Sequence, residues 1–547
     1  MQREPKGPGT LGELSRRRLL QLGVAGAALL GTESVAVAAT PDAGTGPSDR
    51  LDEVTLDELQ ARMASGEETS RSLTQKYLDR IEVRDGRLRS VLETNPDAMA
   101  HAETLDRERK AGTVRGPLHG VPVLIKGNIA TKDRMHTNAG SIALMDATVP
   151  ADAFLVGRLR EAGAVLLGKT QLSEWANFRS THSTSGWSGR GGQCRNPYAL
   201  DRSPSGSSSG SGVAVAANFC AIAVGTETDG SIVSPAAASA LVGIKPTMGL
   251  VSRSGIIPIS HTQDTAGPMG RTVRDAALLL EVLTGRDPAD AASGATGARF
   301  DVRYAAALDR GALKGARIGV ARTKYFGYHP ATDELAEEAL KVLKAEGAVV
   351  IDPANIATVE KLDEPELDVL LYEFKAGLEA YLSKLGGTGP RTLKALIEWN
   401  QAHAETEMPF FGQELFIDAE KKGPLTSAGY LKARQACVRL SRKEGIDATM
   451  SKHRLDAIVA PTQAPPWLID WVNGDHFIGG CSTAPAVAGY PHVTVPMGQV
   501  RGLPVGFSFF GRPWSEARLL GLAYAYEQAT HARKPPTFAA SVTLPVG

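Results

Sequence analysis

The chain has 547 residues, 42% of them hydrophobic, and its 60 basic residues are balanced by 60 acidic ones. A formal net charge of zero argues against nucleic acid or an anionic membrane surface as a partner. No long polar linker follows residue 50, so we expect one large domain over residues 51–536 rather than two independent ones, and a short C-terminal tail over 537–547.

The first 38 residues have the composition of an export signal. The arginines Arg16, Arg17 and Arg18 precede a small and apolar run that ends in Val35–Ala38, an A-x-A type cleavage site. This order predicts a twin-arginine signal over residues 1–38 and a mature protein outside the cytoplasm. A basic patch beside an amphipathic helix is the alternative. Residues 39–50 are then a flexible lead.

Local signals further along predict alternating helices and strands. Thr55 and Glu58 form a capping box that starts the first helix. Periodic apolar positions predict helices and strands of ordinary length in the second half of the chain. The helices are expected near 269–285, 333–347, 366–386 and 427–446, and the strands at 317–321, 348–351 and 455–460.

A strand that ends on a lysine is the first feature with chemical meaning. The apolar run 121–125 leads into Lys126 and is then broken by Gly127. The carboxyl ends of strands form the ligand crevice of an open α/β sheet, so Lys126 is a candidate desolvated base. The simpler alternative is a lysine whose ammonium group reaches solvent at a strand end.

Residues 205–235 contain two glycine-flanked serines, Ser207 and Ser231. The first opens a small-residue apolar segment, and the second follows the acidic turn 226–230. Glycine lets the backbone approach a substrate closely and serine supplies a hydroxyl, a combination typical of an activated serine. A Gly/Ser-rich run is equally typical of a flexible loop, so this segment alone leaves both interpretations open.

The same segment matches G-x-S-x-G with Ser208 at its centre, the nucleophile elbow of Ser-His-Asp hydrolases. That motif needs a strand immediately before it and a helix after it. Residues 196–204 are rich in proline and polar residues and predict a turn instead. We therefore do not assign Ser208 as the nucleophile.

Taken together, these stretches resemble the amidase signature family over roughly residues 52–535. Its markers here include PLHGVPVLIKGN (117–128), SPSGSSSGSG (203–212) and GTETDGSIVSP (225–235). Others, such as SEWANFR (173–179) and FFGQEL (410–415), are most similar to the bacterial peptide amidase branch. The resemblance implies an α/β fold: a single large domain with a mixed twisted β-sheet covered by helices on both faces.

The resemblance also implies a Ser-Ser-Lys triad, with Ser231 as nucleophile, Ser207 as bridging serine and Lys126 as base. It implies a cis peptide bond before Ser207. Serine needs a nearby proton acceptor, and burial can keep a lysine neutral enough to serve as one. Backbone N–H groups of the acidic turn would form the oxyanion hole. They belong to Thr228, Asp229, Gly230 and Ser231.

Two positions depart from the family pattern. Val233 stands where most members carry an arginine after Gly-Ser-Ile, as we expect of the peptide amidase branch. Gly127 stands where an aspartate usually follows the lysine. The second departure removes a carboxylate beside the proposed base and bears on its pKa.

Six residues are candidates for the substrate-binding wall. They are Asn177, Tyr372, Trp399, Phe410, Phe411 and Trp467. Most of the aromatic ones lie in the part of the chain that matches the general family least, while Trp467, like Trp471, lies in a proline-rich loop. Aromatic residues at helical spacing are also typical of a hydrophobic core, so that alternative stays open for them.

Other reactive side chains are assigned structural roles. His119, His261 and His492 lie in family-like segments whose base is a lysine, and Lys245 precedes a proline in a strand-ending turn. We find no H-E-x-x-H or C-x-x-C motif, and the four cysteines are far apart. We therefore expect neither a metal site nor a cofactor.

The sequence thus predicts a secreted, monomeric serine amidohydrolase that releases ammonia from carboxamides, above all from the C-terminal amide of peptides. It would need no nucleic acid and, after signal removal, no membrane. The alternatives are an amidase of small aliphatic or aryl amides, and a non-catalytic or amidotransferase-subunit-like protein. The export signal and the presence of Lys126, Ser207 and Ser231 argue against the last of these.

Overall fold

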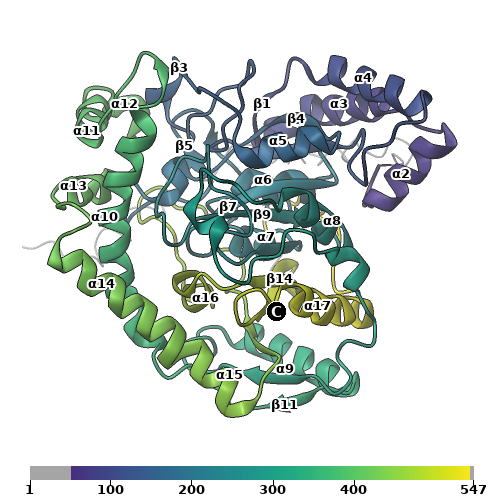
Figure 1. The fold of residues 1–547 in the computed structure, drawn as a ribbon, viewed down its shortest axis with the longest axis vertical. Coiled ribbons are helices and arrows are strands. Elements are labelled where there is room, and N and C mark those ends of the chain that lie inside the picture. The colour runs from purple at the N-terminus through teal and green to yellow at the C-terminus, as the bar shows by residue number, and fades with distance from the viewer. Residues whose placement is uncertain (1–50, 543–547) are drawn as a thin grey trace, which may run out of the picture. The chain divides into compact units, whose positions relative to one another are not determined.

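The computed structural model describes residues 51–542, and Figure 1 shows their course. A mixed sheet of 11 strands runs through this unit. In sheet order the strands are β1 (Val91–Thr94), β4 (Val165–Thr170), β2 (Pro122–Lys126), β7 (Ile222–Glu227), β9 (Thr265–Gly270), β8 (Val242–Lys245), β14 (His492–Val500), β15 (Leu503–Phe510), β13 (Ala457–Pro461), β10 (Arg317–Val320) and β11 (Val349–Ile351). The predicted α/β class is confirmed.

Two small antiparallel pairs accompany the large sheet: β3 (Ala147–Thr148) with β12 (Gly386–Gly387), and β5 (Trp187–Ser188) with β6 (Gly192–Gln193). The α-helices surround the sheet. They are α2 (Leu56–Ser65), α3 (Ser70–Leu88), α4 (Ala98–Lys110), α5 (Phe154–Glu161), α6 (Ser209–Ala216), α7 (Val233–Ala238), α8 (Val273–Leu283), α9 (Pro330–Ala345), α10 (Asp363–Leu382), α11 (Leu393–Ala402), α12 (Ala404–Glu407), α13 (Glu414–Glu420), α14 (Ala428–Val438), α15 (Asp447–His453), α16 (Thr483–Ala488) and α17 (Glu516–Thr530).

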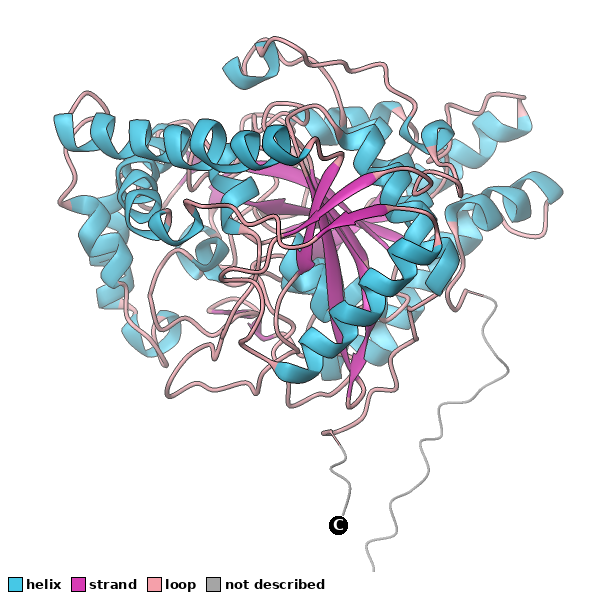
Figure 2. Cartoon of the chain, turned by 90° about the horizontal axis from the view of Figure 1, so that it is seen from below, coloured by secondary structure: helices cyan, strands magenta, loops and turns pink. Residues whose placement is uncertain are grey.

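Helices lie on both faces of the sheet, as Figure 2 shows. Gly243 of β8 faces α7, where an added Cβ would meet the Cβ of Ala236 at 2.7 Å. Gly270, which pairs with Val242, faces α8, where the nearest atom would be the backbone nitrogen of Ala276 at 3.2 Å. Successive residues of a strand point to opposite faces, so α7 and α8 cover opposite sides of the sheet.

The elements that the sequence predicts are present. Thr55 caps α2, its side chain accepting from the N–H of Glu58 while the Glu58 carboxylate accepts from the N–H of Thr55. The four predicted helices correspond to α8, α9, α10 and α14, the last continued by a π-helical turn over Arg439–Ile446. The predicted strands correspond to β10, β11 and β13.

Helices α10, α11, α13 and α14 form a layer at one side of the sheet (Figure 1). Leu378, Leu396 and Phe416 from three of these helices share one hydrophobic cluster with Leu172 and Trp175, which follow β4. Burial of these apolar side chains therefore holds the helical layer against the carboxyl ends of the strands, where the sequence predicts the catalytic residues.

The predictions for residues 1–38 and 39–50 lie outside the described residues. Near the other end, Phe538 donates its N–H to the Pro197 carbonyl at 2.9 Å, and Ala539 forms a bridge with Ala199. No helix among residues 51–542 is long and apolar enough to cross a membrane. Within the same residues all four cysteines are free thiols in buried positions.

Candidate active site

Strands β2 and β7 run parallel and side by side, and their carboxyl ends bring Lys126 and Thr226 together. The Lys126 side chain is fully buried. Its Nζ atom lies 2.8 Å from Oγ of Ser207, 2.9 Å from Oγ1 of Thr226 and 3.2 Å from the Thr226 carbonyl oxygen. The side-chain amide of Asn128 donates to the same Thr226 hydroxyl at 3.0 Å and so holds that hydroxyl in place. The amine is therefore held in one position, against a serine.

Burial is also the main influence on the charge of this amine. It lowers the pKa of Lys126 to about 7, because the ammonium form loses its hydration. The carboxylates of Glu227 and Asp264 act in the opposite direction and limit the decrease. A substantial fraction of Lys126 is therefore neutral near pH 7 and able to accept a proton.

Ser207 lies just before α6, between its partner Lys126 and the neighbouring Ser208, which is hydrogen-bonded to Ser231. The Gly206–Ser207 peptide bond is cis, as the resemblance implies. The next residue, Ser208, donates its N–H to the carbonyl of Ser231 at 3.1 Å, and its hydroxyl bridges the N–H and carbonyl of Thr226. Ser208 thus joins the two serine segments through the backbone, and turn residues, not a strand, precede it.

The acidic turn before Ser231 presents backbone N–H groups. Gly230 has φ +79°, and an added Cβ would lie 3.0 Å from the hydroxyls of both Ser234 and Ser482, so this position requires glycine. The carboxylate of Glu227 accepts the N–H groups of Ile232 and Val233. Within residues 51–542 the N–H groups of the predicted oxyanion hole have no acceptor. They can hold a developing negative charge.

Side chains from distant parts of the chain support this turn. Thr228 donates its hydroxyl to Asp264 at 2.6 Å. The amide of Gln263 donates to the carbonyl of Thr228 at 3.4 Å and to the carboxyl of Glu366, on α10, at 2.7 Å. Burial raises the pKa of Glu366. Gln263 therefore links the helical layer to the oxyanion turn.

A cleft of about 580 Å³ opens at Gly206, Asp229 and Gly230, beside the buried pair of Lys126 and Ser207. Two of the six predicted binding residues, Asn177 and Trp467, line this cleft. Residues that the sequence analysis missed complete its walls. They are Ser180, Thr181, Ser183, Ser185, Ser205, Ser234, Lys324, Asp363, Asp475, Phe477, Ile478, Gly479, Gly480, Ser482 and Thr483.

The other four predicted binding residues do not line the cleft. Tyr372 packs against Tyr430, with ring centroids 5.7 Å apart, and Trp399 stacks on His403 at 3.9 Å. The remaining two are neighbours in the chain. Phe411 is buried under the guanidinium of Arg179, and Phe410 stacks on Trp471 outside the cleft.

The side chains to which we assigned structural roles bond away from Ser207 and Ser231. His492 is buried, with Nε2 at 2.6 Å from the Ser508 hydroxyl, and burial lowers its pKa to about 3. His119 contacts the carbonyl of Leu105 at 3.0 Å. His261 lies 3.4 Å from the carboxylate of Glu373.

Lys245 is as deeply buried as Lys126, so burial alone does not distinguish the two amines. Its Nζ atom donates to the Pro246 carbonyl at 3.3 Å. Burial lowers the pKa of Lys245 to about 8, while Glu227 and Glu516 oppose this decrease. Lys126 differs from it in having a serine hydroxyl as its partner.

Gly127 occupies a confined position. An added Cβ would lie 2.8 Å from a methyl group of Leu92 and 3.2 Å from one of Leu172. A side chain at residue 127 would therefore meet these two leucines and the carbonyl oxygen of Thr170, also at 3.2 Å. Val233, the other departure from the family pattern, is fully buried at the start of α7.

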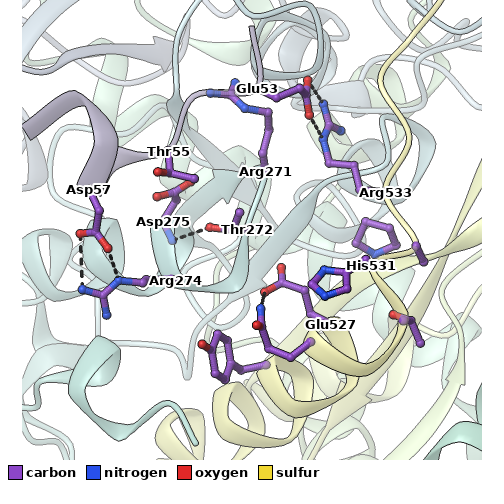
Figure 3. A pocket seen from close by; sticks show the side chains of 15 residues that line it. Glu53, Thr55, Asp57, Arg271, Thr272, Arg274, Asp275, Glu527, His531 and Arg533 are labelled. Atoms are coloured by element: carbon purple, nitrogen blue, oxygen red, sulfur yellow. Dashed lines mark hydrogen bonds and ion pairs between the residues drawn. The ribbon is translucent and has the colours of Figure 1, made fainter. Parts of the chain in front are cut away.

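A second pocket, of about 410 Å³, lies beside Arg271, which follows β9 at the end of the sheet where β7 begins (Figure 3). Several of its charged side chains are paired with one another. Arg533 contacts Glu53 at 2.7 Å, and Arg274 contacts Asp57. We therefore place the chemistry at the carboxyl ends of β2 and β7.

The chain belongs to the amidase family, whose model matches residues 72–520. A probable amidase of Arabidopsis thaliana is 42% identical over 500 residues, which are 90% of this chain and 92% of that protein. The solved structure of the native peptide amidase from Stenotrophomonas maltophilia is 52% identical with a TM-score of 0.86, and the match covers 89% of this chain and 99% of that one. A glutamyl-tRNA(Gln) amidotransferase subunit of Moorella thermoacetica is 36% identical over 501 residues, 88% of this chain and 98% of that protein.

The protein is therefore an amidase signature hydrolase that acts on amides, with a structure close to peptide amidase. The local motifs around Lys126, Ser207 and Ser231 carried this prediction. No local sequence motif indicated that Gln263, Glu366 or the loop residues 475–483 belong to the site, because they reach it only through tertiary contacts.

Proposed function

We propose that the protein hydrolyses the C-terminal carboxamide of peptides through a relay from Ser231 to Ser207 to Lys126. The main support for this relay is the position of Lys126. Its fully buried amine lies 2.8 Å from the Ser207 hydroxyl, and the next residue, Ser208, is hydrogen-bonded to the backbone of Ser231. A neutral lysine there is the proton acceptor that a serine nucleophile requires.

In this mechanism Lys126 accepts the proton of Ser207 as Ser207 accepts that of Ser231. Oγ of Ser231 forms a bond to the carbonyl carbon, and the carbonyl oxygen takes the negative charge, facing the N–H groups of residues 228–231. The relay then returns the proton to the leaving nitrogen, so that ammonia departs and an acyl ester stays on Ser231. Water, deprotonated by the same relay, releases the carboxylic acid.

The peptide preference rests on similarity and on the cleft. The peptide amidase structure is 52% identical to this chain, against 36% for the amidotransferase protein. The cleft has hydrogen-bonding groups suited to a peptide backbone. Oδ1 of Asn177 is buried without a partner among the described residues, and Asp229 also retains one such oxygen. A simple aliphatic amide would leave most of this volume unfilled.

The test is ammonia release from matched amides. We expect amidated dipeptides and tripeptides to be hydrolysed far faster than acetamide or benzamide, with internal peptide bonds left intact by mass spectrometry. Faster turnover of the simple amides would replace the peptide assignment with a small-amide amidase. Ammonia release by the isolated chain would also argue against a role that requires amidotransferase partners.

We further propose that residues 1–38 export the enzyme by the twin-arginine route and that the mature protein acts as a monomer outside the cytoplasm. Supporting this is the Arg16–Arg18 cluster before an apolar run and an A-x-A site. Replacing Arg16, Arg17 and Arg18 by lysine should retain activity in the cytoplasmic fraction, whereas an unchanged location would contradict export by this route.

A further inference from the structure

A basic pocket of about 500 Å³ lies against the β5–β6 pair, whose Gln193 is hydrogen-bonded to Ser185 in the wall of the cleft. Three arginines line it, and no carboxylate does. Its charged and aromatic lining consists of Arg87, Arg89, Arg195, Trp187, Phe410 and Trp471. We refer to it as the arginine pocket.

The positive charge of the arginine pocket is uncompensated. The side chains of Arg87 and Arg195 donate only to backbone carbonyls, those of Phe538 at 3.5 Å and Leu200 at 3.0 Å. The Arg89 guanidinium forms no ion pair or hydrogen bond within residues 51–542, and both Arg87 and Arg89 are exposed. The chain as a whole has no net charge, so this local excess of cations is a property of the site.

An exposed aromatic surface adjoins these arginines. Phe410 and Trp471 stack with ring centroids 4.8 Å apart and planes inclined by 16°, and each is 40% exposed. Trp187 packs edge-on against Phe410, and Nε1 of Trp471 donates to the side chain of Gln193 at 3.1 Å. The rings are therefore held in place and leave apolar surface open to a ligand.

The walls of the arginine pocket and of the cleft are connected by one loop and by one hydrogen-bonded pair. The loop 463–480 carries Trp467 on the cleft side and Trp471 on the arginine side. Gln193, which holds Trp471, also donates to the carbonyl of Ser185 at 2.9 Å, and Ser185 lines the cleft. Ser185 in the wall of the cleft and Gln193 in the wall of the arginine pocket are therefore direct neighbours, and a peptide that reaches from one pocket to the other has to pass them.

The two sites differ in charge. The cleft presents the carboxylates of Asp229, Asp363 and Asp475 against a single lysine, Lys324, which is itself paired with Asp363 at 2.6 Å. An acidic substrate residue is disfavoured beside these groups and favoured beside unpaired guanidinium groups. Apolar parts of the same peptide can pack on Phe410 and Trp471.

We propose that the arginine pocket is a subsite for acidic residues lying upstream of the amidated end of a peptide substrate. This inference rests on the proposed peptide amidase function and specifies which peptides the enzyme prefers. The ligand is the peptide substrate itself, recognised by its carboxylates and by apolar contact.

The test uses octapeptide amides that share one C-terminal dipeptide amide and carry aspartate, serine or lysine upstream. At low salt we expect kcat/KM for the aspartate series to exceed that for the serine series about fivefold, mainly through KM, as for a few partly exposed ion pairs. The difference should disappear near 1 M salt, where the Debye length falls to about 3 Å. The dipeptide amide alone should show no salt effect of this size.

The double variant Arg87→Gln/Arg89→Gln should abolish the aspartate preference without changing turnover of the dipeptide amide. Arg310→Gln is the matched control, an exposed arginine before β10, far along the sheet from β1. Arg195 is left in place because its hydrogen bond to the carbonyl of Leu200, at 3.0 Å, is partly buried, whereas that of Arg87 to the carbonyl of Phe538, at 3.5 Å, is exposed.

The outcomes separate the two proposals. Suppose that the dipeptide amide is hydrolysed but kcat/KM is the same for the aspartate and serine series, or that Arg310→Gln has the same effect as the double variant. The arginine subsite is then wrong, and the peptide amidase function stands. If no peptide amide is hydrolysed, the peptide function fails. Calorimetric titration of an aspartate octapeptide acid into the protein and the double variant then tests the pocket directly, and equal binding would overturn it.

Discussion

The Nζ atom of Lys126 and Oγ of Ser207 are hydrogen-bonded at 2.8 Å although neither side chain is accessible to solvent. A lysine and a serine 81 positions apart are brought together because β2 ends beside the loop that begins α6. Removing both from water favours the neutral amine, and a neutral amine can exchange a proton with the hydroxyl.

Replacing members of the relay should reduce ammonia release sharply. Ser231→Ala should lower kcat by about a million-fold, and Ser207→Ala and Lys126→Ala by several orders of magnitude each, since residues that act as a unit are not additive. Active-site titration with an acylating inhibitor should label the unmodified protein and not Ser231→Ala. Circular dichroism and thermal unfolding of each variant serve as the control for misfolding, and substantial turnover in folded Ser231→Ala would end the mechanism.

The rate should depend on pH through the Lys126 amine. Burial lowers the pKa of Lys126 to about 7, so the proton-accepting neutral form grows as the pH rises through that value. We expect kcat/KM for a peptide amide, measured from pH 5 to 9, to rise about tenfold per pH unit on the acidic side and to level off above neutrality. A profile that is flat from pH 5 upward would mean that another group takes the proton.

Gly127 allows an electrostatic test of the same amine. A carboxylate near Lys126 stabilises the ammonium form, so Gly127→Asp should move the acidic limb of the rate profile to higher pH. Gly127→Asn has the same size without the charge and serves as the control. Both variants are made with Leu92→Ala, because the Leu92 methyl group would lie 2.8 Å from an added Cβ. Equal acidic limbs in the two double variants would show that the absence of a carboxylate at 127 has no electrostatic consequence.

Activity should also survive metal chelation. In the proposed mechanism Lys126 takes the proton and backbone N–H groups hold the negative charge, so no step calls for a Lewis acid. We expect EDTA to leave the rate of ammonia release unchanged. A loss of activity that zinc restores would favour metal-assisted hydrolysis instead.

Sequence patterns predicted the parts of the site that are contiguous in the chain. The apolar run before Lys126 and the glycines around Ser207 and Ser231 are local signals, and each lies where the pattern places it, at a strand end or in a turn. The network around Thr228 could not be found in this way. Gln263 and Glu366 are 103 residues apart and meet only once α10 packs against the sheet.

The aromatic candidates also show that a local pattern does not reveal tertiary contacts. Helical spacing indicates that Phe411 and Trp399 lie on a face of some helix or turn, but not which neighbour covers that face. In the structure Arg179 covers Phe411 and His403 covers Trp399, whereas Trp467 lies in a loop and reaches the cleft. Position in a loop at the strand ends was therefore the better indicator of which aromatic side chain reaches the cleft.

Two tryptophans, Trp467 and Trp399, are both candidates for the substrate-binding wall, and the structure separates them. Trp467 lines the cleft and is almost fully buried there, and its Nε1 donates to Asp475 at 2.9 Å. Trp467→Ala should raise KM for amidated tripeptides about tenfold, because the wall against which the acyl side packs is lost. Trp467→Phe keeps a ring and loses only the hydrogen bond, so its KM should change less.

Trp399→Ala is the matched control, since the same side chain is removed outside the cleft, where it stacks on His403. It should leave KM within about twofold of the unmodified enzyme, as expected for a substitution away from the substrate. Acetamide, which is too small to reach the wall, should be hydrolysed at similar rates by all three variants. If Trp399→Ala raises KM as much as Trp467→Ala does, the acyl side of the substrate lies along α11 rather than in the cleft beside Gly230, and the direction assigned to the bound peptide is wrong.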